Sequence, residues 1–141
     1  MQKVTLRLAT KEDKSLIITF DDYCRKVEEK IAKAISDKEC FMALAGSAAV
    51  GFVIFDYRFF ERGWMELLIL DEKYRGKGIG GQVFDLICEQ CKTDKLFTST
   101  NRSNLPMQKA LTKSGFTFAG KIDGLDEGDP ELFYYKIISA K

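Results

Sequence analysis

The chain has 141 residues, of which 45% are hydrophobic, so we expect residues 1–141 to form a single domain with its own core. Its net charge of +1 argues against a nucleic-acid-binding surface and against binding to anionic membranes. The absence of histidine excludes Ser-His-Asp and Cys-His catalysis, as well as zinc sites that contain histidine. Any proton transfer must therefore use Glu, Asp, Tyr, Cys, Lys or water.

The chain has four cysteines, and their spacing does not suggest a metal site. Cys88-x-x-Cys91 has the spacing of half a zinc or redox site, but Cys24 and Cys40 are too far apart to complete it. The pair also lies in a helical pattern, where cysteine commonly fills a core. We expect reduced cysteines, no metal and, because the N-terminal residues are too charged for a signal peptide, a cytoplasmic protein.

The first half of the chain is expected to contain four strands and two helices. Apolar runs predict the strands at Val4–Leu8, Cys40–Leu44, Val50–Tyr57 and Trp64–Leu70. Thr10-x-x-Asp13 is a capping-box pattern that starts one helix, and Tyr23–Ser36 has the periodicity of another. Arg58–Gly63 is expected to be a loop between the last two strands.

The second half begins with a helical pattern at Gly78–Cys91, followed by a strand at Lys95–Thr100. A helix is predicted over Asn104–Ser114, because a proline lies in its first turn and a glycine follows its end. Two final strands are expected at Thr117–Ile122 and Leu132–Ile138. This order of elements predicts an α/β (α+β) protein in which a mixed sheet carries helices on both sides.

The most informative segment is Leu67–Gln82, where an apolar strand is followed by a glycine-rich basic turn and then by a helix. Glycines allow the backbone to approach a ligand closely. The first N–H groups of a helix lack intrahelical partners and lie at the positive end of the helix dipole. The segment therefore predicts an anion site, and phosphate is the expected anion.

Two common phosphate motifs do not account for this turn. The P-loop pattern is absent, since no Gly-Lys-Ser/Thr follows a glycine at the required spacing. Gly76, Gly78 and Gly81 match the dinucleotide fingerprint G-x-G-x-x-G, but no acid ends the next strand, where a ribose would be bound. We interpret this match as accidental, although it keeps a nicotinamide-dinucleotide protein as a third class of function.

Arg75-x-x-Gly78-x-Gly80 resembles the R/Q-x-x-G-x-G/A motif of the GNAT superfamily of N-acetyltransferases. Two other segments are similar to the family in the same order: the opening Thr5–Asp13, and a later part that reads Asn101-x-x-Asn104, Ala110-Leu111 and Lys113–Phe116. The resemblance spans nearly the whole chain. It implies a mostly antiparallel sheet of about six or seven strands with about four helices, and transfer of an acetyl group from acetyl-CoA to a primary amine.

The resemblance also implies which residues bind the cofactor. Backbone groups of three strand residues would hydrogen-bond the pantetheine arm, namely Leu68, Ile69 and Leu70. The pyrophosphate would be held by the N–H groups of the turn, from Arg75, Gly76, Lys77, Gly78, Ile79, Gly80 and Gly81. The side chains of Arg75 and Lys77 would add charge, unless they form only a solvated basic turn. Asn104 matches an asparagine that contacts the cofactor arm, or it is the N-cap of its helix.

Glu66 is the candidate catalytic residue, because it is the only acid inside an otherwise apolar strand. By strand alternation it would share a face with Trp64, Leu68 and Leu70. A carboxylate among apolar side chains is suited to act as a general base. The alternative is a structural ion pair, with Arg58 across the hairpin as the expected partner.

Leu111 is a departure from the family, since it lies where a tyrosine usually serves as general acid. Either Tyr134 or Tyr135 on the last strand replaces it, or water does, or the thiolate leaves unaided. The departure also motivates a second hypothesis, a non-catalytic acyl-CoA-binding module on the same fold.

The acceptor leaves few marks in the sequence, and a small molecule is expected rather than a protein. The acidic segment Asp123–Asp129 would attract a cationic amine, or it is a solvated loop. Phe59 and Phe60 would line a pocket or a dimer contact, or they form a core-edge pair. Small enzymes of this family often dimerise, so a homodimer is a further expectation.

Overall fold

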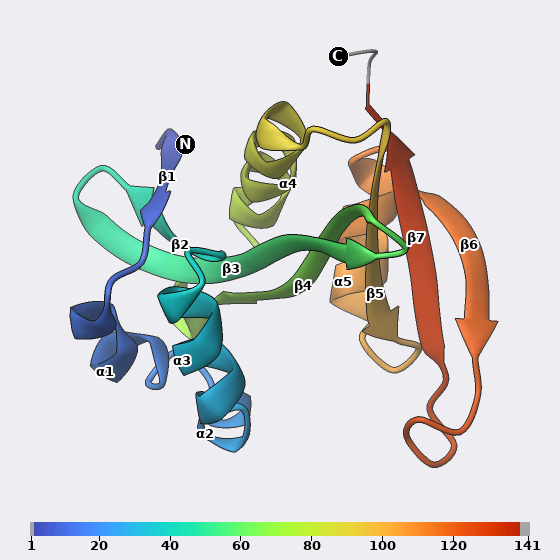
Figure 1. Ribbon diagram of the computed structural model, residues 1–141, viewed down its shortest axis with the longest axis horizontal. Helices are drawn as coiled ribbons and strands as arrows, with labels where there is room; N and C mark the ends of the chain where they lie inside the picture. The colour runs from blue at the N-terminus through green and yellow to red at the C-terminus, as the bar shows by residue number, and fades with distance from the viewer. Residues whose placement is uncertain (1, 139–141) are drawn as a thin grey trace.

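The computed structural model describes residues 2–138. Its centre is a seven-stranded sheet with the order β1-β2-β3-β4-β5-β7-β6 (Figure 1). The strands are β1 (Val4–Leu8), β2 (Cys40–Ala45), β3 (Ala48–Phe59), β4 (Arg62–Leu70), β5 (Lys95–Asn101), β6 (Thr117–Ile122) and β7 (Glu131–Ile137). Every neighbouring pair is antiparallel except β4 and β5, which are parallel. The expected mixed, mostly antiparallel sheet is confirmed.

Helices cover both faces of this sheet (Figure 1). The elements on one face are the 3-10 turn η1 (Lys11–Asp13), α1 (Lys14–Ile17), α2 (Asp22–Lys26) and α3 (Glu28–Ser36), and they enclose a core with Phe52 and Ile54. The helices α4 (Ile79–Gln90) and α5 (Leu105–Lys113) cover the other face over Val53 and Met65. A 3-10 turn, η2 (Glu72–Tyr74), joins β4 to α4. No helix within residues 2–138 has the length and apolarity needed to span a membrane.

The helix expected over Tyr23–Ser36 is in fact two helices. Val27 lies between them with φ −117° and ψ 29°, outside the helical region. Valine is a weak helix former because its branched Cβ restricts the side chain. Cys24 and Ile31 are both buried in the same core, so the apolar spacing continues across the break and hides it from a periodicity argument.

The four cysteines are free thiols and three of them are buried, which agrees with the expectation that they fill cores. Cys24, Cys40 and Cys91 are buried in the two cores. Burial raises the pKa of the Cys40 thiol to about 12, so this thiol stays protonated and unreactive at neutral pH.

The loop expected over Arg58–Gly63 is a tight hairpin. Strand β3 continues to Phe59, which pairs with Arg62, and only Phe60 and Glu61 form the turn. Both turn residues have positive φ angles, 52° and 63°. Two-residue hairpins normally use Asn or Gly at such positions, and neither is present here. The turn therefore carries no recognisable sequence signal.

A β-bulge interrupts β4 at Glu66. Ile54 and Phe55, consecutive on β3, pair with Leu67 and Met65, so Glu66 is an extra residue without a partner in the ladder. Bulges of this kind redirect the side chains that follow them.

Because of the bulge, the side chains of β4 do not alternate between the two faces of the sheet as the sequence predicted. Leu68 and Leu70 pack in the core beneath α4, whereas Leu67 and Ile69 pack in the core beneath α1–α3. Glu66 bonds to Trp64 and to a lysine of α3, so it lies on the α1–α3 side. The prediction that Glu66 shares a face with Leu68 and Leu70 is wrong, because strict alternation assumes an unbroken strand.

Strands β4 and β5 separate soon after they meet. They pair only over residues 63–65 of β4 and 96–98 of β5. The hydroxyl of Thr98 donates to the carbonyl of Met65 at 2.8 Å, at the last of these pairs. Beyond it the two strands diverge (Figure 1). The far half of β4 therefore has an edge that β5 leaves unpaired.

Asp13 ties β1 to the first helical elements. Its carboxylate accepts from the Arg7 guanidinium at 2.8 and 2.9 Å and from the Thr10 backbone N–H at 2.7 Å. The Arg7 hydrogen bond is the largest cause that lowers the pKa of Asp13 from 3.8 to about 2. Because the folded-state pKa is below the unfolded one, this stabilisation is present at neutral pH and is lost as the pH falls from about 4 to about 2.

Asp13→Asn is expected to lower the free energy of unfolding at pH 7 by about 1–2 kcal/mol, since it removes a charged hydrogen-bond acceptor and a helix-start contact. Urea unfolding of both proteins measures this difference. At pH 2 most of the difference should disappear, because the Asp13 carboxyl is then almost fully protonated in the unfolded state and about half protonated in the folded one. An equal difference at both pH values would contradict the assigned role of the charge.

Candidate active site

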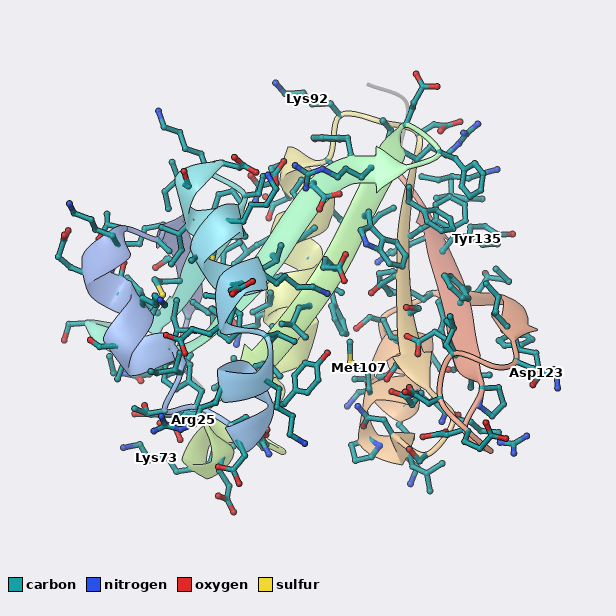
Figure 2. The ribbon with its side chains drawn as sticks, turned by 60° about the horizontal axis from the view of Figure 1, so that its bottom comes forward. Arg25, Lys73, Lys92, Met107, Asp123 and Tyr135 are labelled. Atoms are coloured by element: carbon teal, nitrogen blue, oxygen red, sulfur yellow. The ribbon has the colours of Figure 1, made fainter. Side chains whose placement is uncertain are left out.

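A cleft of about 420 Å³ opens between the end of β4, the start of α4 and helix α5. All the predicted cofactor-binding residues except Lys77 line it: Leu68, Ile69, Leu70, Arg75, Gly76, Gly78, Ile79, Gly80, Gly81 and Asn104. The sequence did not point to the other lining residues, which are Asp21, Phe84, Pro106, Met107 and Ala110. Met107 lies at the gap between β4 and β5 (Figure 2).

The glycine-rich turn presents unused backbone donors to the cleft. Gly76 and Gly78 have φ angles of 74° and 80°, and Gly78 is the N-cap of α4. Within residues 2–138, the N–H groups of residues 76–81 have no acceptor. A Cβ atom added at Gly76 or Gly80 would meet no atom within 4 Å, so both positions face open space. Free donors at a helix N-terminus fit a pyrophosphate.

The side chain of Arg75 has partners within the protein, although Arg75 also lines the cleft. Its Nε donates to the Leu70 carbonyl at 3.0 Å, and its guanidinium is 2.8 Å from the Asp21 carboxylate. Its backbone N–H donates to Glu72. The pKa of Asp21 is lowered, first by the backbone N–H of Tyr23 and then by Arg75. The Arg75 side chain therefore joins the turn to the N-cap of α2.

Lys77 is exposed and lies outside the cleft lining, with its ammonium 6.0 Å from the centre of the Tyr74 ring. Asn104 is the N-cap of α5 and also lines the cleft. Its side chain accepts from the Met107 N–H at 3.2 Å.

Glu66 lies at the bulge, where β4 and β5 part. Its Oε1 accepts from Trp64 Nε1 at 3.0 Å, and its Oε2 is 3.1 Å from Lys30 Nζ on α3. The side chain of Glu66 is 32% exposed, so the carboxylate reaches solvent. The expected pairing with Arg58 is wrong, because Arg58 bonds to Glu39 at 2.8 Å and to Asp56. An ion pair exists, but its partner comes from a helix that is distant in sequence.

The candidate proton donors lie on opposite sides of the sheet. Leu111 is a completely buried residue of α5, and Tyr134 is 5% exposed in the same core. Tyr135 is half-buried on the other face, and the centre of its ring lies 5.7 Å from that of Phe97. Since Trp64 pairs with Phe97 and Phe97 pairs with Tyr135, only Tyr135 of the two tyrosines lies on the face of Trp64 and Glu66.

The acidic segment after β6 is held by hydrogen bonds from residues at the end of β5 and just after it. Asp129 accepts from the backbone N–H and hydroxyl of Ser103, at 3.0 and 2.6 Å, and Asp126 accepts from Asn101 at 2.8 Å. These contacts give the carboxylates a structural role in fixing the loop beside the start of α5.

Several solved structures are similar to this chain. A GNAT-family acetyltransferase from Bacillus cereus ATCC 10987 is 28% identical, with a TM-score of 0.86 over 95% of this chain and 96% of that one. An N-acetyltransferase from Staphylococcus aureus Mu50 is 20% identical, with a TM-score of 0.77 over 96% and 99%. A Salmonella typhimurium protein determined with its cofactor acetyl-CoA is 14% identical, with a TM-score of 0.76 over 99% and 96%. The last two show a common fold.

A search of curated proteins finds no significant match. The model of the Acetyltransferase (GNAT) family matches residues 7–116, a stretch that includes the bulge at Glu66, the glycine-rich turn and Asn104. The sheet order and the flanking helices also agree with the GNAT structures. The chain therefore belongs to the acetyltransferase (GNAT) family.

Proposed function

We propose that this protein transfers the acetyl group of acetyl-CoA to the primary amine of a small molecule. The observation that carries the proposal is the row of free N–H groups at residues 76–81, which lines a cleft leading to the unpaired edge of β4. A diphosphate would accept from these N–H groups at the N-terminus of α4. The pantetheine amides would pair with the edge at Leu68 and Ile69 as an added strand does.

The reaction follows from this placement. Acetyl-CoA supplies a thioester, whose carbonyl carbon is the electrophile. Glu66, at the point where β4 and β5 part, takes a proton from the ammonium of the acceptor, directly or through one water. The amine nitrogen then forms the C–N bond, the C–S bond breaks, and the thiolate of CoA leaves. Tyr135 or solvent supplies the proton that the thiolate needs.

A non-catalytic acyl-CoA-binding module remains the second candidate, and the specific observation in its favour is the buried Leu111 at the tyrosine position. Thermal unfolding with acetyl-CoA, CoA and NAD tests the cleft, since a ligand that binds the folded state raises the transition temperature. Release of free thiol in the presence of primary amines tests turnover. A rise with the CoA ligands and thiol release support the transferase, and a rise without release supports the binding module. A rise with NAD alone would overturn both.

A further inference from the structure

Five aromatic side chains lie together on one face of the sheet, outside both cores. They are Phe59, Trp64, Phe97, Phe133 and Tyr135, and we call them the aromatic face. Phe59 stacks on Trp64 and on Phe133, with ring centres 4.7 and 5.7 Å apart, and the ring centre of Phe97 lies 5.0 Å from that of Phe59. Strand pairing assembles the group, because Phe97 is opposite both Trp64 and Tyr135.

All five rings are only half-buried, although their neighbours in sequence, such as Leu96 and Tyr134, are buried on the other side. Within residues 2–138, α1–α3 pack against β2 and β3, and the view in Figure 1 has no helix in front of β5, β7 and β6. A contiguous group of large apolar side chains left open to water is typical of a binding surface.

The aromatic face borders the proposed reaction centre. Trp64 donates its Nε1 hydrogen to Glu66 at 3.0 Å, so the first ring of the face touches the proposed base. A second carboxylate, Glu131, lies among the β5 and β7 residues of this face and accepts from Ser99 at 2.6 Å. No cation within residues 2–138 forms an ion pair with Glu131.

We propose that the aromatic face binds the acceptor, and that the acceptor is a monoamine with an aromatic or other flat apolar group. This inference rests on the proposed function. Lys30 partly neutralises Glu66. Glu66 and Glu131 together therefore leave enough negative charge to balance about one ammonium group. The body of the acceptor stacks on the rings, because aromatic pairs attract each other beyond what their buried area contributes. The further ammonium groups of a polyamine would lose hydration over these rings and gain only a weak cation–π attraction in return.

The test compares kcat/KM for phenethylamine, n-butylamine and spermidine, with thiol release as the readout. Phenethylamine should exceed the other two by about tenfold or more, which corresponds to about 1.4 kcal/mol. Phe133→Leu, which keeps the side chain apolar but removes the ring, should raise KM for phenethylamine by about tenfold while changing kcat/KM for n-butylamine less than twofold. Phe118→Ala is the matched control, since this exposed phenylalanine contacts Tyr134 on the other side of the sheet, and it should change neither.

Calorimetric titration of phenethylamine into the CoA-saturated protein separates this inference from the proposed function. Binding that Phe133→Leu weakens, without thiol release, would preserve the aromatic face as a binding site and overturn the transferase. Equal kcat/KM for the three amines, a preference for spermidine, or a uniform loss for all amines in Phe133→Leu would overturn the inference while leaving the transferase intact. If no thiol is released and phenethylamine does not bind, both are wrong.

Discussion

Gly80→Asp is expected to weaken CoA binding by about 100-fold or more while the protein remains folded. Gly80 is the second residue of α4, and a Cβ added there faces open space in the cleft. A carboxylate at this position would lie where the pyrophosphate is proposed to bind. Two like charges about 4 Å apart repel by about 4 kcal/mol at an effective dielectric constant of about 20, more than a 100-fold loss requires.

The same substitution should not reduce stability. Glycine is a poor helix former, and an acid in the first turn interacts favourably with the helix dipole by about 0.3–1 kcal/mol. Calorimetric Kd values for CoA and the thermal transition of the unliganded protein measure the two effects separately. Gly80→Ala, which adds a methyl group without charge, is the matched control and should retain most of the affinity. An unchanged Kd in Gly80→Asp would place the pyrophosphate elsewhere.

Glu66→Gln is expected to lower kcat by about 100-fold or more with less than a twofold change in the Kd of acetyl-CoA. General-base catalysis commonly contributes about 10²–10⁴ in rate, and an amide cannot accept the proton. Glutamine is isosteric and can still accept the hydrogen bond from Trp64 Nε1, so the bulge should persist. Initial rates of thiol release with a saturating amine give kcat, and titration calorimetry gives the affinity.

Lys30→Gln distinguishes a catalytic Glu66 from a purely structural one. The Lys30–Glu66 pair is partly exposed at both ends, and such pairs contribute at most about 1 kcal/mol to stability. If Glu66 acts by holding α3 in place, both variants should slow the reaction similarly. If Glu66 takes the proton, Lys30→Gln should retain most of the wild-type rate. Normal turnover in Glu66→Gln would remove this residue from the mechanism.

The predictions from sequence were accurate where a local pattern has a direct physical cause. Strand positions followed from apolar alternation, and α4 was expected from its periodicity after a run of glycines. Gly78 adopts a positive φ as the N-cap, which is the conformation that glycine permits. Asn104 caps α5, as the proline in the first turn suggested. The family followed from three segments in order: the opening Thr5–Asp13, the turn with Arg75, Gly78 and Gly80, and the later part from Asn101 to Phe116.

The errors concern contacts between residues that are distant in sequence. Glu66 was paired with Arg58 because the two are neighbours on a hairpin, but the ammonium that reaches it belongs to Lys30 on α3. The sequence also did not indicate that Arg75 pairs with Asp21, 54 residues away. Neither contact has a local signature, since each depends on how α2 and α3 pack against the sheet.

The sequence by itself determined the order of the elements, the family and the position of the glycine-rich turn, because each rests on interactions within a few residues of the chain. Only the tertiary structure decided the bulge at Glu66, the point where β4 and β5 part, and the aromatic face. These depend on strand register, and register is set by non-local pairing and by how two cores pack on opposite faces. A single unpaired residue in β4 was enough to change the face on which the rest of the strand lies.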